Sequence, residues 1–219
     1  MVGGQVINIL YEDNHILVVE KPINIPVQED NTKDKDLLTI LKEYIKEKYQ
    51  KQGNVYLGLI HRLDRPVGGV MVFAKTSKAA SRLSKQVQTH QFEKKYYAVV
   101  EGNIEEKGKY VDKLLKDKKN NITTVNPNGK EAILEFKKIK SKNNLSLVDI
   151  NLKTGRSHQI RVQFSYHGYP LYGDQKYNQN AIKNQIALFA YSLSFYHPIT
   201  KEKVIFTLDK PDRYPFTLF

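Results

Sequence analysis

Residues 132–152 read AILEFKKIKSKNNLSLVDINL, and this stretch decides the fold class. Apolar and polar residues alternate in two segments, Ala132–Ile139 and Leu145–Leu152, as they do in strands that bury one face. Between the segments lies Asn143-Asn144, a pair suited to a tight turn because Asn tolerates the left-handed backbone conformation. The stretch therefore predicts two antiparallel strands joined by a short turn.

The same pattern of short strands continues on both sides of this stretch. Turn signals such as Asn128-Gly129 separate the strands, and many of the links are short enough for hairpins. Further strands are predicted at Lys94–Glu101, Ile122–Val125, His158–Phe164, Leu188–Phe195 and Lys203–Leu208. So many hairpin-length links favour an α+β fold with a mainly antiparallel mixed sheet, rather than alternating βαβ units.

Two helices are predicted in the first half of the chain, where strands are expected at His15–Val19 and Val70–Ala74. Apolar residues recur at three- and four-residue intervals from Leu37 to Tyr49, and Asp34 or Asp36 is available as the N-cap. A second helix is expected over Ser77–Gln88, with Ala80, Leu83 and Val87 on its buried face. Because the chain has no internal repeat and no Pro/Gly/Ser-rich linker, we expect helices flanking the sheet in one domain, residues 5–215.

Charge and composition narrow the function classes. The formal net charge of +12 favours a polyanionic partner, either nucleic acid or an acidic membrane. No apolar stretch is long enough to cross a membrane, and no secretory signal is recognisable, so we expect a cytoplasmic protein without a membrane partner. The absence of cysteine excludes disulfides, thiolate metal sites and a cysteine nucleophile, and suits a reducing compartment.

Four of the six arginines fall into two short segments, of which the first is HRLDR, residues 61–65. Here Asp64 stands between Arg62 and Arg65 in a probable loop between two ordered elements. Neighbouring guanidinium groups keep a carboxylate ionised, and the ionised form is the one that acts as a nucleophile or base. The alternative is a surface ion pair that helps to fix a turn, a common and weak interaction.

The second arginine-bearing segment is LKTGRSHQIRVQF, residues 152–164. As a strand it would place His158 on the apolar face and Gln159, Arg161 and Gln163 on a solvent-exposed face. Thr154-Gly155-Arg156-Ser157 precedes it and offers backbone donors, a hydroxyl and a guanidinium, a grouping suited to phosphate. The alternative is an exposed strand without a ligand.

Other residues admit two interpretations. His61 and His158 allow a general acid and base reading, as in an RNA-cleaving hydrolase, but His158 is more simply a packed core histidine. Tyr96 shares its strand face with apolar residues and is either a core or a cleft residue. No histidine pair has metal-ligand spacing, so we expect no metal and no cofactor.

HRLDR and TGRSHQIR, in this order and nearly a hundred residues apart, resemble the RluA-type family of RNA pseudouridine synthases. The resemblance continues through several further blocks in matching order: VVEKP, KKYYAVVEG, GYPLYGDQKY and FAYSLSFYHP. It spans nearly the whole chain, from about Ile9 to Pro198. The sequence departs from the family pattern at Asn24, at Val67-Gly68 and at Gln163, and we expect these departures to be peripheral to the chemistry.

The resemblance implies the pseudouridine synthase fold with a central RNA-binding cleft. By this resemblance, the catalytic residues are Asp64, Arg161, which pairs with it, and Tyr96, which stacks on or deprotonates the target base. It implies RNA contacts by His61, Arg62, Arg65, Arg156, His158 and Gln159.

The expected substrate is a specific uridine in structured rRNA or tRNA, and a monomer without the S4 domain of many relatives is expected. Further RNA affinity is expected from lysine-rich loops at 113–119 and 137–142. The alternative is a non-catalytic RNA-binding paralogue.

Overall fold

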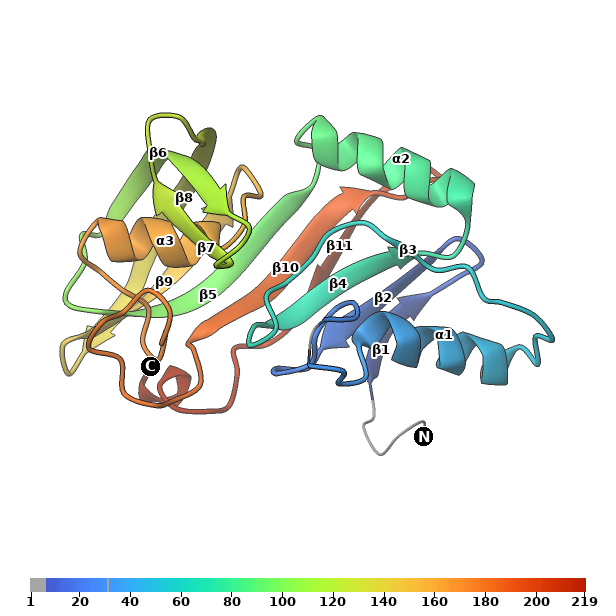
Figure 1. The fold of residues 1–219 in the computed structure, drawn as a ribbon, viewed down its shortest axis with the longest axis horizontal. Coiled ribbons are helices and arrows are strands. Elements are labelled where there is room, and N and C mark those ends of the chain that lie inside the picture. The colour runs from blue at the N-terminus through green and yellow to red at the C-terminus, as the bar shows by residue number, and fades with distance from the viewer. Residues whose placement is uncertain (1–6, 31) are drawn as a thin grey trace. The chain divides into compact units, whose positions relative to one another are not determined.

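The computed structural model describes residues 7–30 and 32–219, which form two compact units (Figure 1). Unit 1 contains the described residues up to Phe92 together with Ser192–Leu208. Unit 2 contains Glu93–Tyr191 and Asp209–Phe219. The strand patterns and the helices of the first half are confirmed in outline, and the fold is α+β with a mostly antiparallel sheet.

Unit 1 is a small antiparallel sheet with two helices. Its elements are β1 (Asn8–Glu12), β2 (Ile16–Lys21), α1 (Leu37–Lys48), β3 (Gly58–Leu59), β4 (Gly68–Ala74), α2 (Ser77–Gln88), the second part of β10 (Leu188–Tyr196) and β11 (Lys203–Thr207). The strand order is β1-β2-β4-β10, with β3 paired to β4 and β11 paired to β10.

The core of unit 1 forms around β2 and β4. Every residue of β4 is buried, and the apolar side chains of Ile16, Val18 and Val72 pack with Leu83 of α2. Figure 1 shows α2 alongside β3 and β4. Both predicted helices are confirmed, and Asp36 caps α1 by accepting from the Thr39 N–H at 3.0 Å.

The buried face of α2 differs in detail from the prediction. Leu83 is fully buried as expected, but Ala79 and Gln86 are the other buried residues, while Ala80 and Val87 are partly buried. Gln86 is buried because its amide pairs with the backbone of Tyr196 in β10, a requirement that apolar spacing does not reveal.

Glu12 joins β1 to α1. Its carboxylate accepts hydrogen bonds from Tyr44, Lys48, Tyr49 and Lys75 at 2.7 to 2.9 Å. Burial alone would raise the pKa of Glu12, but these four donors outweigh burial and hold the pKa at about 2. The carboxylate is therefore ionised throughout the physiological range and fixes the helix to the sheet edge.

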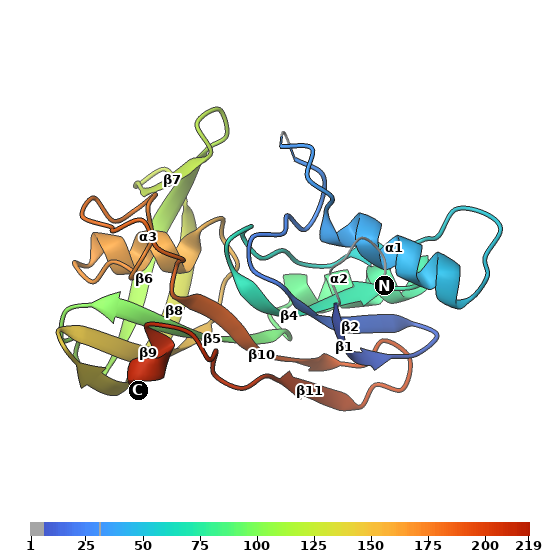
Figure 2. The same cartoon turned by 90° about the horizontal axis from the view of Figure 1, so that it is seen from below.

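Unit 2 is a larger antiparallel sheet with one helix. Its elements are the first part of β10, β5 (Glu93–Glu101), β6 (Lys107–Asp117), β7 (Ile122–Val125), β8 (Lys130–Lys142), β9 (Leu145–Leu152), α3 (Gln159–Tyr166) and the 3₁₀ turn η1 (Phe216–Leu218). The strand order is β10-β5-β9-β8-β6-β7. Figure 2 shows these strands from a second direction.

The hairpin predicted at 132–152 is confirmed. Strands β8 and β9 pair antiparallel, and Lys142 lies opposite Leu145 across the turn. Asn143 and Asn144 both adopt positive φ, 53° and 56°, as a type I′ turn requires.

The lysine-rich stretches expected as loops are largely strands. Residues 113–117 belong to β6 and 137–142 to β8, and Lys107 lies opposite Lys137 across this pair of strands. The exposed face of β6 carries so many charges that its sequence resembles a loop. Only the burial of Tyr110 and Leu114 on the other face marks it as a strand.

The strand predicted at His158–Phe164 is wrong. The segment forms helix α3, Gln159–Tyr166, which follows His158 in the left-handed conformation (φ 54°) and packs against β6 and β7. Every residue from Gln159 to Phe164 is buried, so the expected exposed face of Gln159, Arg161 and Gln163 is also wrong. When all residues of a helical segment are buried, its polar residues contact protein rather than solvent. The sequence then lacks the one-sided polar face by which a helix is distinguished from a strand.

Candidate active site

The HRLDR segment forms the connection between β3 and β4 of unit 1. The backbone carbonyl of Asp64 accepts from the Val67 N–H at 2.9 Å, which closes a turn over Arg65-Pro66. Leu63 and Val67 are buried on either side of this turn, 7% and 2% exposed, whereas Asp64 is only partly buried. The sequence therefore presents a carboxylate on a short turn anchored by apolar residues at both ends.

Lys21, at the end of β2, holds this turn from inside. Its side chain is fully buried, and Nζ donates to the carbonyl oxygens of Pro22 (2.9 Å), Arg65 (2.9 Å) and Val67 (2.7 Å). Burial lowers the pKa of Lys21 to about 7, and the nearby Asp64 carboxylate opposes that shift. An ammonium has three N–H donors, which match these three acceptors. Sequence reasoning missed this role, although Lys21 lies in the block VVEKP.

Arg65 is directed to the 30–34 loop of unit 1. Its guanidinium donates to the Thr32 hydroxyl at 2.7 Å, pairs with Asp34 and lies 3.5 Å from Asp30. Arg62, on the other side of Asp64, has an exposed side chain. The two arginines that flank Asp64 in sequence therefore have different surroundings, and the RNA contacts expected of them stay predictions.

His61, in the connection between β3 and β4, packs against other residues of unit 1. Its Nε2 accepts from the Val72 N–H of β4 at 3.3 Å, and its ring meets Phe92 edge-on with centroids 6.1 Å apart. A ring nitrogen that accepts from a backbone N–H requires the tautomer protonated at Nδ1. This arrangement favours a positioning role in unit 1 over the general acid of a hydrolase.

In unit 2, Tyr96 lies on β5 and is 6% exposed. It stands opposite Ile150 of β9 and shares its strand face with Ala98, which is fully buried. The position therefore fits the core interpretation of Tyr96, and its catalytic role stays a prediction.

Arg161 forms a bidentate ion pair with Asp174. Nε and Nη2 of Arg161 donate to the two carboxylate oxygens of Asp174 at 2.8 and 2.6 Å. The two residues are 7% and 1% exposed, and the guanidinium carbon lies 5.2 Å from the centroid of the Tyr177 ring. Fork-to-fork pairing of this kind fixes a guanidinium in position as well as in charge.

Asp174 is the functional candidate that sequence reasoning missed. It also accepts from the backbone N–H groups of Lys176 and Tyr177, at 3.0 and 3.3 Å, so its carboxylate both caps a turn and holds Arg161. The signal was present in the block GYPLYGDQKY, where Asp174 is the one acidic residue.

The phosphate-binding arrangement expected at Thr154–Ser157 is partly used within the protein. The Thr154 hydroxyl and the Arg156 N–H both donate to Oε1 of Gln159, at 2.8 and 3.0 Å. The guanidinium of Arg156 is exposed, with Nε donating to the Glu131 carbonyl at 2.8 Å. Two of the expected anion ligands are therefore committed to Gln159, whereas the arginine head lies at the surface.

Gln159 and Gln163 form a buried amide chain along α3. Gln159 donates to the Ile133 carbonyl at 3.1 Å and to Oε1 of Gln163 at 3.0 Å. Gln163 in turn donates to Asp112 at 2.7 Å and to the Ala132 carbonyl at 3.1 Å. Both amides connect the helix to β6 and β8, so Gln163 has a larger structural role than expected. The RNA contact expected of Gln159 stays a prediction.

His158 precedes α3 and contacts Tyr177. Its Nδ1 lies 2.5 Å from the Tyr177 hydroxyl, and this hydroxyl also accepts from the Thr123 N–H at 3.0 Å. The tautomer of His158 decides which of the two groups donates in this hydrogen bond. The histidine is partly buried and packed, as the simpler interpretation held.

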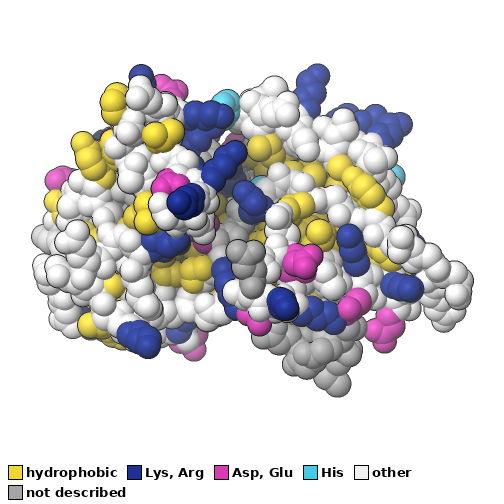
Figure 3. All heavy atoms as spheres, in the orientation of Figure 1, with side chains coloured by type: hydrophobic (Ala, Val, Ile, Leu, Met, Phe, Trp, Pro, Cys, Tyr) yellow, Lys and Arg dark blue, Asp and Glu magenta, His cyan; other side chains and the backbone are white. Residues whose placement is uncertain are grey.

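Within residues 7–30 and 32–219, no group of three or more His, Asp or Glu side chains is arranged to hold a metal ion. No helix in the same part of the chain is long and apolar enough to span a membrane. On the face drawn in Figure 3, Lys and Arg side chains cover more of the surface than Asp and Glu. A positive surface suits a polyanion.

Comparisons with known sequences point to one family. The family model described as RNA pseudouridylate synthase matches residues 15–166. An uncharacterised RNA pseudouridine synthase of Aquifex aeolicus is 33% identical over 225 residues, covering 95% of this chain and 71% of the relative. Ribosomal large subunit pseudouridine synthase C of Buchnera aphidicola is 34% identical, covering 91% and 65%. The chain thus spans about two thirds of the length of these relatives.

Solved structures show the same fold. The human protein named RNA pseudouridylate synthase domain containing 4 superposes with a TM-score of 0.80 at 22% identity, covering 96% of this chain and 91% of that one. Human RNA pseudouridylate synthase domain containing 1 gives a TM-score of 0.74 at 21% identity, covering 96% and 87%.

Proposed function

Because the chain belongs to the RNA pseudouridylate synthase family, whose members are isomerases, we propose that Asp64 is the catalytic carboxylate that converts uridine to pseudouridine in RNA. One observation carries the assignment. Asp64 lies on a turn whose backbone is held by the buried ammonium of Lys21 and by two apolar anchors. The turn therefore fixes the backbone that carries this carboxylate, and covalent or base catalysis needs a positioned carboxylate.

The reaction needs one carboxylate and no redox step. The N1–C1′ bond breaks, the uracil turns, and C5 bonds to C1′, while the C5 hydrogen leaves as a proton and N1 takes up a proton. The sugar becomes electron-poor at C1′, and the carboxylate either attacks C1′ or removes the C2′ proton to give a glycal, which regains that proton when C5 bonds to C1′. Glycoside hydrolases typically use two carboxyl groups to manage a water and a leaving group, whereas here the uracil is both leaving group and nucleophile.

We assign catalytic roles in unit 2 to Arg161 and Tyr96. The support for Arg161 is its fixed orientation, because the bidentate pair with Asp174 uses two of the five N–H groups of the guanidinium. Tyr96 is assigned the contact with the target base, which must leave its stack at a cost of a few kcal/mol. Contacts to RNA are assigned to the exposed heads of Arg62 and Arg156.

We propose ribosomal RNA as the first substrate class to test, because the Buchnera relative is named for the large ribosomal subunit. Transfer RNA is the second class. Residues 5–215 are proposed to act as one catalytic domain in a cytoplasmic monomer. A non-catalytic RNA-binding role is the rival function.

Tritium release tests the proposed function directly. Unmodified rRNA and tRNA transcripts labelled at C5 of uracil are incubated with wild type and with Asp64→Asn. Release by the wild type and none by the variant is the expected result, because forming the C5–C1′ bond expels that hydrogen. Unchanged release by Asp64→Asn would show that another group carries the reaction. RNA binding without release by the wild type would support the non-catalytic rival.

A further inference from the structure

We propose that Lys94 binds a phosphodiester group of the RNA whose uridine is presented to Tyr96, and so positions the substrate. This inference rests on the proposed function, since it assigns a further contact to the same substrate. It makes Lys94 a positioning residue rather than a catalytic one.

Lys94 is partly buried, and its amine has no anionic partner among the residues that the structure describes. It lies near the start of β5, and among the residues that the structure describes its amine makes no hydrogen bond and no ion pair. Burial lowers the pKa of Lys94, and no neighbouring charge contributes to that shift. A buried charge that lacks a partner is costly to a folded protein.

Other enclosed lysines of this chain have partners. Lys21 donates to three carbonyl oxygens, Lys75 pairs with Glu12 at 2.7 Å, and Lys138 pairs with Glu106 at 2.9 Å. Lys94 differs from these three lysines in having no such partner among the residues that the structure describes. A group that the chain itself does not supply is the simplest way to complete its surroundings.

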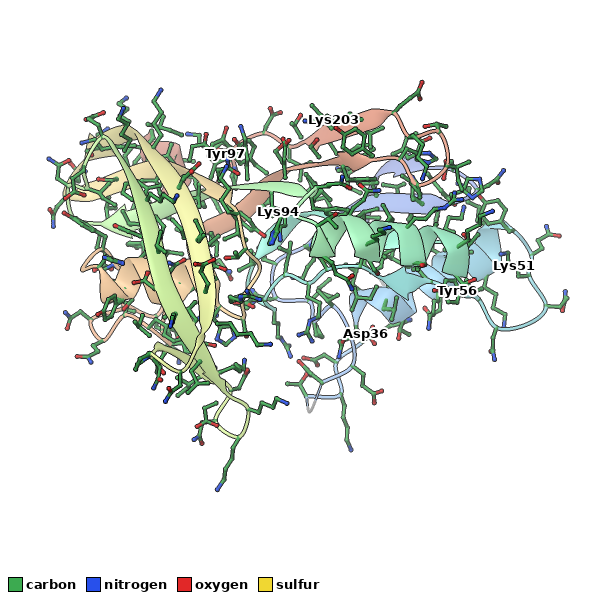
Figure 4. All side chains as sticks on the ribbon, turned by 90° about the horizontal axis from the view of Figure 1, so that it is seen from above. Asp36, Lys51, Tyr56, Lys94, Tyr97 and Lys203 are labelled. Atoms are coloured by element: carbon green, nitrogen blue, oxygen red, sulfur yellow. The ribbon has the colours of Figure 1, made fainter. Side chains whose placement is uncertain are left out.

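The position of Lys94 connects it to Tyr96. The two residues are two apart on one strand, so their side chains leave the same face about 6.6 Å apart along it. Figure 4 shows the side chains of Lys94 and Tyr97 on opposite sides of β5. Tyr97 stacks on Tyr191 with ring centroids 3.9 Å apart, so that other face is already filled. Since every nucleoside in RNA is flanked by phosphates, a base held at Tyr96 brings an anion close to Lys94.

The amine of Lys94 lies beside Gly155. A Cβ placed on Gly155 would lie 3.1 Å from Nζ of Lys94, so the amine sits directly against a backbone without a side chain. Gly155 belongs to the exposed segment Gly155–Ser157, where the Arg156 side chain also reaches the surface. The Lys94 amine therefore lies next to a segment that also carries the exposed Arg156, and phosphate is the anion that the substrate carries.

Binding measured without catalysis tests the inference. The probe is an unmodified rRNA transcript, and the proteins carry Asp64→Asn so that no turnover occurs. Lys94→Met is compared with Lys107→Met, which removes one charge from an exposed position on β6, outside the two lysine-rich stretches expected to bind RNA. A lost charged hydrogen bond predicts an affinity roughly 10- to 100-fold weaker for Lys94→Met. The slope of log K against log salt should become shallower by about 0.7 to 0.9.

Two further variants separate contact from folding. Lys94→Arg should restore most of the affinity, and far-ultraviolet circular dichroism should match wild type for every variant used. With Asp64 restored, Lys94→Met should raise KM by at least tenfold and leave kcat within about threefold. Equal affinities and salt slopes for Lys94→Met and Lys107→Met would overturn the inference. Absence of tritium release with intact binding would instead contradict the proposed function alone.

Discussion

Asp174→Asn tests whether the Arg161–Asp174 pair holds unit 2 together. The substitution keeps the volume and removes the charge. The amide has one acceptor oxygen where the carboxylate had two, and its NH₂ group turns a donor towards the donors of Arg161. The buried guanidinium would then lose the charge of the carboxylate to which it donates two hydrogen bonds.

The magnitude follows from the geometry. Arg161 donates two charge-assisted hydrogen bonds to Asp174 at 2.8 and 2.6 Å, and both residues are more than nine-tenths buried. Opposite charges about 4 Å apart attract by about 4 kcal/mol at an effective dielectric near 20. Removing one partner of a buried pair typically costs about 3–5 kcal/mol. We expect Asp174→Asn to lower the free energy of unfolding by this amount.

Urea denaturation followed by circular dichroism and tyrosine fluorescence measures this change, because the chain has 14 tyrosines and no tryptophan. Glu135→Gln is the matched control. It removes the charge from an exposed pair with Lys153, whose side chains are 45% and 43% exposed, and such pairs contribute about 0–1 kcal/mol. A loss below 1 kcal/mol for Asp174→Asn, or one equal to that of the control, would refute the reasoning.

Three further predictions concern single positions. The pKa of Glu12 is about 2 in the folded protein and 4.5 ordinarily, so the ionised carboxylate stabilises the fold by about 3 kcal/mol above pH 4.5. This stabilisation is lost as the pH falls towards 2, and the difference in unfolding free energy between wild type and Glu12→Gln, measured in urea, should disappear over that range. Gly129→Ala would place a Cβ 2.4 Å from the Leu114 backbone and should cost about 1–3 kcal/mol or more, whereas Gly53→Ala, with nothing within 4 Å, should lie within about 0.5 kcal/mol of wild type in thermal unfolding. Lys21→Met leaves three carbonyl oxygens without their hydrogen-bond donor, so tritium release should fall at least tenfold while RNA affinity stays within about threefold of wild type. Unchanged release would mean that Lys21 does not hold the turn that carries Asp64.

The local sequence pattern was enough to predict the strands and helices that have one apolar and one polar face. The hairpin of β8 and β9 was predicted because polarity alternates on both sides of Asn143-Asn144. Helix α1 was predicted with Asp34 or Asp36 as its N-cap, and the structure shows that Asp36 is the cap. The position of Asp64 in a connection between ordered elements also followed from the residues around it.

Tertiary structure decided what enclosed polar residues do. Segment 159–164 alternates like a strand, yet it forms a helix because protein surrounds it on every side and its glutamines bond across to β6 and β8. Lys21, Lys94 and Asp174 are charged residues, and no local sequence pattern indicates their roles. The first is matched to three carbonyls, the second lacks an anion, and the third holds Arg161. A buried charge is defined by the partners that folding brings to it, and those partners are distant in sequence.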